Sequence, residues 1–260
     1  MEPEIIFTRV EKNGRSLAEI TLNRPQKGNA LTLAMLAEIE AAVKTVETDP
    51  SLRALVLRGN GRFFCTGGDI EAWSSLSPDE MARDWILRGI EVMERIAALP
   101  QPVIAVISGH ALGGGLELAL AADVRIALQT AKLGTPEVGL GMIAGWGGVR
   151  KLAETIGVAR ARHLTLLGSA IEARQALDWG LVTLLAEDAT NLEAKLDELL
   201  GRLLSNAPIA MRETKAILAT MNLDLRKQHA AAVAKVAATA DCKEGVRAFR
   251  EKRPPSFQNR

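Results

Sequence analysis

Hydrophobic and polar positions in the first fifty residues predict a strand hairpin followed by a helix. Two short apolar stretches, residues 4–10 and 17–22, flank the turn signal KNG at residues 12–14, a pattern typical of an antiparallel hairpin. Residues 31–48 then carry apolar side chains at helical spacing, with Thr32 in position to cap the helix. The chain is therefore expected to open with two paired strands and one amphipathic helix.

The same two spacings alternate as far as residue 128. Apolar runs of strand length are separated by a long helical stretch that opens with Ser77-Pro78, where serine can cap and proline can take the first helical position. This alternation predicts a layered α/β core. The expected strands are residues 54–58, 103–107 and 124–128, and the expected helices are residues 77–99 and 116–122.

From about residue 191 the pattern changes to helical spacing alone. Pro208 stands near one expected helix start, and residues 229–240 form an alanine-rich run. The apolar faces of these helices need a surface to cover, which is either the core or a second copy of the chain.

Composition and charge exclude several classes of protein. With 260 residues, 48% of them hydrophobic, and a net charge of +1, the chain has enough apolar material for one large core and no electrostatic bias toward nucleic acid or membrane. Cys65 and Cys242 lie far apart and the three histidines are scattered, so we expect neither a disulfide framework nor a metal site. The amino-terminal residues lack a signal-peptide pattern, and we expect a cytoplasmic protein.

The stretch GHALGGGLEL at residues 109–118 joins a strand, a glycine turn and a short helix. It is not a dinucleotide fingerprint, because Leu118 occupies the place of the third glycine, and no P-loop Lys-Ser or Lys-Thr follows. Backbone N–H groups at such a helix start can bind an anionic oxygen. Glu117 lies in an otherwise apolar helix and should be buried, where burial raises its pKa and the helix start lowers it. The alternative is a structural glutamate bonded to nearby backbone.

Two further segments carry candidate chemistry. FFCTGGD at residues 63–69 places two glycines after a strand, as a nest of N–H groups or as a generic turn. LGTPEVGLG at residues 133–141 contains Glu137, either a turn residue or a second carboxylate beside Glu117. Together the two glycine turns and two glutamates form a coherent set, a carboxylate pair for acid and base chemistry with a polarising site for an oxyanion.

The order and spacing of several segments resemble those of the crotonase, or enoyl-CoA hydratase/isomerase, family. The resemblance covers essentially the whole chain and implies an α/β spiral of ββα units in residues 1–195, with a helical trimerisation region in residues 196–260. Such trimers are commonly stacked in pairs as hexamers. The matching segments are RPQKGNALT (24–32), FCTGGDI (64–70), SGHALGGGLELALAADVRIA (108–127), LGTPEVGLGMIAGWGGVRKL (133–152) and AFREKRPPSF (248–257).

The resemblance also implies site residues. Gly68 and Gly114 match the positions whose N–H groups form the oxyanion hole around the thioester carbonyl, and Glu117 and Glu137 match the two catalytic glutamates of the hydratases. Asp69 and Glu71 fall in the segment that follows the adenine and pantetheine parts of coenzyme A. The expected substrate-binding residues are Thr66, Gly68, Asp69, Ile70, Glu71, Gly114 and Trp146.

Hydration of a 2-enoyl-CoA thioester is the expected reaction, with Glu117 as main base for the water and Glu137 as main acid for Cα. Coenzyme A is then part of the substrate, and no separate cofactor, metal, nucleic acid or membrane partner is expected. Double-bond isomerisation or decarboxylation by the same fold stays open as an alternative. A further alternative is a non-catalytic member that binds acyl-CoA or RNA.

Some residues depart from the family pattern or have a second interpretation. The family often has proline-glycine before the later glycine pair, whereas this chain reads Ala144-Gly-Trp-Gly-Gly. Trp146 in this run either shapes the acyl pocket or is a packing residue. Cys65 is expected to be a buried thiol rather than a nucleophile, and Asp123 with Arg125 a structural hydrogen-bonded corner.

Overall fold

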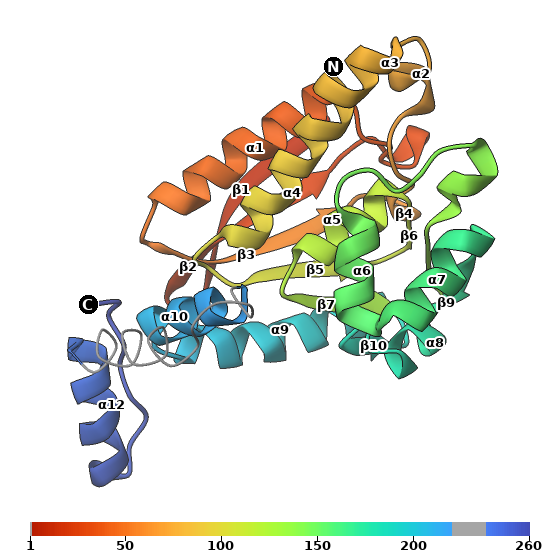
Figure 1. Ribbon diagram of the computed structural model, residues 1–260. Helices are drawn as coiled ribbons and strands as arrows, with labels where there is room; N and C mark the ends of the chain where they lie inside the picture. Colours follow the sequence, from red (N-terminus) through yellow and green to blue (C-terminus); the bar gives the residue numbers. More distant parts are fainter. Residues whose placement is uncertain (1, 220–237) are drawn as a thin grey trace.

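A computed structural model describes residues 2–219 and 238–260. Within these ranges six strands form the main sheet, in the order β1-β2-β3-β5-β7-β10 (Figure 1). The first two strands pair antiparallel, from Ile5 with Leu22 to Lys12 with Arg15, which confirms the predicted hairpin. All other neighbours in this sheet are parallel. The strands are β1 (Ile5–Lys12), β2 (Arg15–Leu22), β3 (Leu52–Gly59), β5 (Val103–Ile107), β7 (Val124–Leu128) and β10 (Leu184–Ala186).

A second, smaller sheet has the order β4-β6-β8-β9 in the described chain. Its first three strands run parallel and the fourth is antiparallel to β8. Each of β3, β5 and β7 is followed along the chain by one of these short strands and then by a helical turn, so the expected ββα repeat is present. The strands are β4 (Phe63–Cys65), β6 (His110–Leu112), β8 (Lys132–Gly134) and β9 (Ala170–Glu172).

Helix α1 (Leu33–Thr48) begins as predicted, because the side chain of Thr32 accepts a hydrogen bond from the N–H of Met35 at 3.2 Å. The predicted capping serine, Ser77, also forms a full capping box with Glu80 at the start of α3 (Pro78–Glu80). The helix expected over residues 77–99 differs in one respect. Its middle part, Met81–Leu87, has π-helical geometry before α4 (Arg88–Ala98) resumes the α-helix, and this wider turn carries the buried Trp85.

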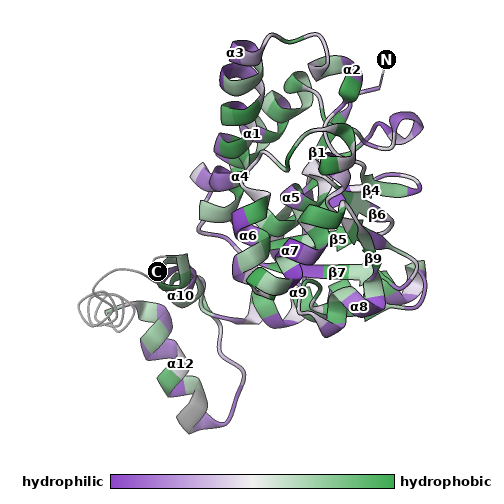
Figure 2. Ribbon diagram, turned by 45° about the vertical axis from the view of Figure 1, so that its right-hand side comes forward, coloured by the Kyte–Doolittle hydropathy of each residue, from purple (hydrophilic) through white to green (hydrophobic). Residues whose placement is uncertain are grey.

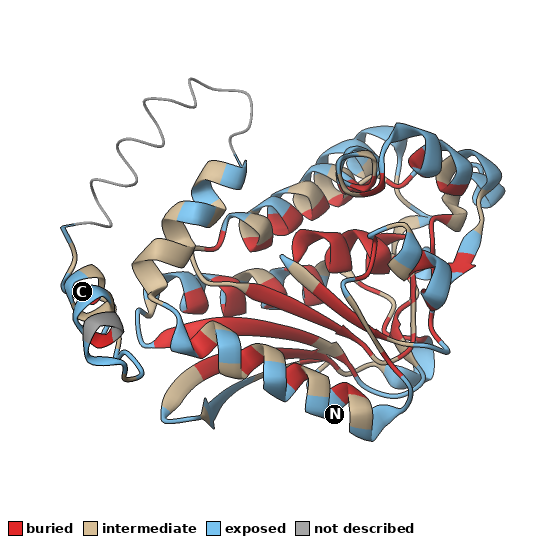
Figure 3. Cartoon of the chain, turned by 90° about the horizontal axis from the view of Figure 1, so that it is seen from below, coloured by how far each residue is buried: buried red, intermediate tan, exposed pale blue. Residues whose placement is uncertain are grey.

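Helices cover both faces of the main sheet, as expected for strands that are apolar on both sides. Leu55 and Leu57 of β3 face the cluster that includes α1 and α4, whereas Ala54 and Val56 face the opposite cluster. Figure 3 shows mostly buried central strands between helices that are buried on one side only. Every residue of α5 (Gly114–Ala121) is buried. Figure 2 shows the corresponding alternation of hydrophobic and hydrophilic residues around the outer helices.

Helix α9 (Ala189–Ser205) closes the second face of the sheet with four leucines at a spacing of four residues, Leu192, Leu196, Leu200 and Leu204. The boundary predicted at residue 195 falls inside this helix, and the division into two parts stays a prediction. The other helices are α2 (Ile70–Trp73), α6 (Gly148–Ile156), α7 (Val158–Leu167), α8 (Ala173–Asp178), α10 (Pro208–Ala219) and α12 (Ala240–Glu251).

The carboxyl-terminal helix α12 lies apart from these layers, at the lower left of Figure 1. Its segment is tied to the rest by a hydrogen bond from Arg15 to the carbonyl of Phe257 at 2.7 Å. Of the alanine-rich run predicted at residues 229–240, residues 229–237 lie outside the described residues. Among the residues described, no helix is long and apolar enough to cross a membrane.

Candidate active site

Three neighbouring parallel strands of the small sheet end at the same edge. The turn with Gly67 and Gly68 follows β4, the turn with Gly113 and Gly114 follows β6, and the loop with Glu137 follows β8. Because the carboxyl ends of parallel strands meet on one side of a sheet, ligands commonly bind there. The fold therefore brings together three segments that are up to seventy residues apart in the sequence.

The two glycine turns contact each other and present unpaired N–H groups. Gly67 and Gly113 have positive φ angles of 111° and 54°, a conformation that glycine adopts without strain. A Cβ on Gly67 would lie 3.3 Å from the nitrogen of Gly114. Within the described residues, the N–H groups of Gly68 and Gly114 donate no hydrogen bond. Gly114 is the first residue of α5, where the helix leaves its N–H groups free and the local potential positive.

Glu117 is buried beneath these turns, with only 4% of its surface exposed. Its Oε1 accepts hydrogen bonds from the N–H groups of Trp146 at 2.8 Å and Gly148 at 2.7 Å. Burial raises the pKa of Glu117 to about 7, with a contribution from the charge of Glu137, although these two N–H groups oppose the rise. The N–H groups that hold this carboxylate thus come from the loop before α6 and from the first residue of α6.

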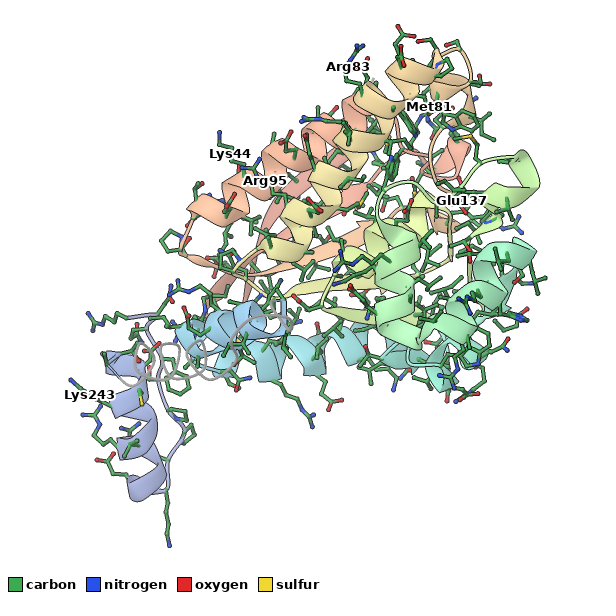
Figure 4. The ribbon with its side chains drawn as sticks, in the orientation of Figure 1. Lys44, Met81, Arg83, Arg95, Glu137 and Lys243 are labelled. Carbon is green, nitrogen blue, oxygen red and sulfur yellow. The ribbon has the colours of Figure 1, made fainter. Side chains whose placement is uncertain are left out.

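Glu137 has a different environment. Both of its carboxylate oxygens are buried without a hydrogen-bond partner among the described residues. Oε1 lies beside the glycine turn, 3.0 Å from the place of a Cβ on Gly113. Burial raises the pKa of Glu137, and only its own backbone N–H acts against this. Figure 4 shows Glu137 within the molecule, while the labelled Lys44, Arg83 and Lys243 lie at its outside.

Both glutamates line one cavity of about 100 Å³ between α5, the π-helical segment and the loop before α6. Seven of the residues predicted for the site lie on its wall, namely Thr66, Gly68, Ile70, Gly114, Glu117, Glu137 and Trp146. Sequence reasoning missed Trp73, Trp85, Ile86, Met142 and Ile143. One signal was present, because the chain has only four tryptophans and three of them surround this cavity.

Asp69 and Glu71, expected along coenzyme A, do not line the cavity. Asp69 is buried, forms an ion pair with Arg24 and caps α2 by accepting from the N–H of Glu71 at 2.9 Å. Burial acts to raise the pKa of Asp69, but the bonds from Arg24 and the backbone outweigh it and lower the pKa. The side chain of Glu71 is 79% exposed and pairs with Lys27 at 3.1 Å. Asp69 therefore has a structural role at the start of α2.

Trp146 is a packing residue and also lines the cavity. Its indole is 4% exposed and packs at 5.5 Å between ring centroids against Trp85, whose carbonyl accepts a hydrogen bond from Nε1 at 3.2 Å. The same side chain forms part of the cavity wall. A Cβ on Gly114 would lie 2.5 Å from Cζ3 of this indole, so the ring packs directly against the glycine turn.

Other candidate residues have the structural roles that the sequence predicted. Cys65 is fully buried, and burial raises the pKa of its thiol to about 12. Asp123 accepts from the N–H of Val103 and from Lys215, both at 2.7 Å, and Arg125 donates to backbone carbonyls. Over residues 2–219 and 238–260 no cluster of three His, Cys, Asp or Glu side chains is placed to hold a metal ion.

Comparison with known proteins agrees with this geometry. Residues 12–260 match the family model described as enoyl-CoA hydratase/isomerase. Crotonyl-CoA hydratase of Syntrophomonas wolfei is 39% identical over 258 residues, 97% of each chain. Short-chain-enoyl-CoA hydratase of Clostridium acetobutylicum is 37% identical over 257 residues, covering 96% of this chain and 97% of the relative.

The fold gives the same result. The crystal structure of an enoyl-CoA hydratase from Bacillus anthracis is 35% identical and aligns with a TM-score of 0.92, covering 99% of this chain and all of that one. The likeness extends over the core and the carboxyl-terminal helices together, which a chance similarity of α/β layers does not explain. The chain therefore belongs to the enoyl-CoA hydratase/isomerase, or crotonase, family.

Proposed function

We propose that this protein is an enoyl-CoA hydratase, which adds water across the double bond of a 2-enoyl-CoA thioester to give a 3-hydroxyacyl-CoA. One observation carries the proposal: the buried Glu117 and the half-buried Glu137 line the same small cavity as Gly68 and Gly114, whose N–H groups donate no hydrogen bond within the described residues. An acid and base pair next to two free donors meets the needs of addition to a conjugated thioester. The relatives named as crotonyl-CoA and short-chain-enoyl-CoA hydratases support the same substrate class.

The two N–H groups act on the thioester carbonyl. Attack of water at Cβ moves negative charge onto the carbonyl oxygen, and donors fixed by the backbone stabilise this charge without reorganising. Loss of one such donor typically costs about 3 kcal/mol, roughly a hundredfold in rate. Because the donors of Gly68 and Gly114 are backbone groups, only a change such as Gly114→Pro removes one of them.

The two carboxyl groups divide the proton transfers. A pKa of about 7 lets Glu117 accept a proton from water near neutral pH. Its Oε1 is held by two N–H groups, so Oε2 is the oxygen left to orient the water. Glu137, whose pKa is raised by burial and whose oxygens have no partner, delivers a proton to Cα. The coenzyme A part enters with the substrate and takes no part in these transfers.

The direct test is hydration of crotonyl-CoA, followed by the loss of the conjugated thioester absorbance and by mass spectrometry of the product in H₂¹⁸O. We expect one labelled oxygen in 3-hydroxybutyryl-CoA. Glu117→Gln and Glu137→Gln should each lower kcat by roughly a hundredfold or more while butyryl-CoA binding persists. Migration of the double bond without uptake of ¹⁸O, or release of CO₂ from a carboxyacyl thioester, would replace hydration by isomerisation or decarboxylation.

We also propose that the region from residue 196 onward mediates a homotrimer, alone or stacked as a hexamer, in the cytoplasm. Helix α10 has no fully buried residue, and Leu218 at its end and Val246 of α12 are exposed. Such apolar helical surface is typical of an interface with another copy. The free thiols of Cys65 and Cys242 are compatible with a reducing compartment. Light scattering after gel filtration measures the assembly directly, and a monomer at micromolar concentration would contradict it.

A further inference from the structure

Trp146 belongs to the walls of two cavities. The first is the cavity of about 100 Å³ that the glutamates and the glycine turns line. The second is a cavity of about 420 Å³ between α4, α5 and α6. Among the described residues, only Trp146 and Glu117 belong to the walls of both. Since Glu117 is held by its two hydrogen bonds, the indole is the removable part of the partition.

The indole is held in place on several sides. A Cβ on Gly89 of α4 would lie 2.1 Å from Cδ1 and Nε1 of Trp146, and one on Gly114 would lie 2.5 Å from Cζ3. Contacts of this length leave no room for a side chain at either glycine. Nε1 also donates to the carbonyl of Trp85. Close contacts at two glycines and one hydrogen bond therefore hold the ring in its observed position.

The first cavity is small for an acyl chain. A closed apolar cavity of about 150 Å³ holds a benzene molecule, so one of 100 Å³ has room for roughly four carbons. The wall of the second cavity includes the apolar side chains of Ile90, Met93, Ala97 and Ala121. Apart from the buried Glu117, its charged residues are exposed, namely Glu94, Arg150, Lys151 and Glu154. Its surroundings suit an aliphatic tail.

We infer that Trp146 determines acyl chain length in this enzyme: its indole closes the acyl site after a short chain, and its removal joins the site to the cavity behind it. This inference rests on the proposed function for the identity of the ligand, an acyl-CoA thioester. The loop backbone that holds Glu117 does not depend on the indole, because the hydrogen bond comes from the N–H of residue 146. A smaller residue at this position therefore leaves the carboxylate bonded.

The experiment compares the wild-type protein with Trp146→Ala across thioesters of four, six, eight and ten carbons. Binding of the saturated acyl-CoAs by calorimetry needs no catalysis, and kcat/KM for the 2-enoyl-CoAs gives the second measure. In the wild type, binding should weaken beyond the shortest chains. In Trp146→Ala each further methylene that enters the second cavity should strengthen binding, up to about fourfold per methylene. Binding of the longer chains by Trp146→Phe should be intermediate between the wild type and Trp146→Ala. This variant takes the place of Trp146→Ala in the test if the alanine variant does not fold.

Two controls separate the partition from general loosening. Trp179→Ala removes an indole that packs against His163 and Arg160 away from the site, and it should leave the chain-length profile unchanged. Ala97→Trp fills the second cavity. In the otherwise wild-type protein, Ala97→Trp should leave the dependence of binding on chain length unchanged. In the double variant with Trp146→Ala, it should abolish the stronger binding of long chains.

A folded Trp146→Ala protein with the wild-type profile would overturn the inference. Stronger binding of long chains that persists in the double variant Trp146→Ala/Ala97→Trp would also overturn it. Failure of the wild type to hydrate crotonyl-CoA would instead refute the proposed function, while the binding series with saturated thioesters still measures the length limit.

Discussion

Glu117→Gln is expected to stabilise the protein more as the pH rises. The carboxylate is buried, and its pKa is raised from 4.5 in a free chain to about 7 in the folded protein, first by burial and then by the charge of Glu137. The folded state therefore binds more protons than the unfolded chain between these values. The stability contributed by this group is complete below pH 4.5 and is lost as the pH rises through about 7.

The magnitude follows from the two pKa values. Each tenfold difference in proton affinity corresponds to about 1.4 kcal/mol, so holding Glu117 ionised in the folded protein costs about 3 kcal/mol at pH 8. Glutamine is neutral at every pH and its carbonyl oxygen can accept the same two N–H bonds. The variant should therefore gain stability over the wild type by about 2 kcal/mol between pH 5.5 and pH 8.

Urea unfolding followed by circular dichroism, at several pH values and one fixed protein concentration, measures this difference. Glu154→Gln is a matched control, since this glutamate is half exposed and pairs with Arg150 on the surface of α6. Its difference from the wild type should stay within about 0.5 kcal/mol at all pH values. The measured quantity is the free energy of unfolding of Glu117→Gln minus that of the wild type. If this difference does not change with pH, or shrinks as the pH rises, the argument that ionising this buried carboxylate destabilises the folded protein is refuted.

Three further predictions concern packing and charge around the site. Gly89→Ala should destabilise the protein by about 1–3 kcal/mol because its Cβ meets Trp146, yet stabilise a Trp146→Ala protein by up to about 1 kcal/mol; urea unfolding of the four proteins should show this change of sign. Cys65 should resist alkylation until denaturant is added, since its thiol is buried and its pKa is about 12, whereas Cys242 should react first; equal rates in peptide mass mapping would contradict the burial. Asp69→Ala should cost about 3 kcal/mol of unfolding free energy, because Arg24 loses a partner where both side chains are mostly buried; an unchanged urea midpoint would exclude a structural role.

Local features of this chain were determined by the sequence alone. The hairpin, the cap at Thr32 and the capping box at Ser77 depend on residues within a few positions of one another, so they can be recognised from spacing and residue type. Burial of Glu117 follows in the same way from the apolar helix around it. The segments around Glu117 and Glu137 also indicated a carboxylate pair, and the resemblance to a family added the match of both residues to the catalytic glutamates of the hydratases.

Tertiary structure decided how these features meet. The three-residue strands β4, β6 and β8 are too short to show a hydrophobic period, yet their parallel pairing brings the glycine turns and Glu137 to one edge. The N–H groups that hold Glu117 come from positions 29 and 31 residues further along the chain. The partner of the Trp146 indole lies 61 residues earlier, and Asp69 forms an ion pair with Arg24, 45 residues earlier along the chain. A one-dimensional pattern records which residues can be buried or bonded, but the choice among distant partners is made only when the sheet, the helices and the turns pack into one volume.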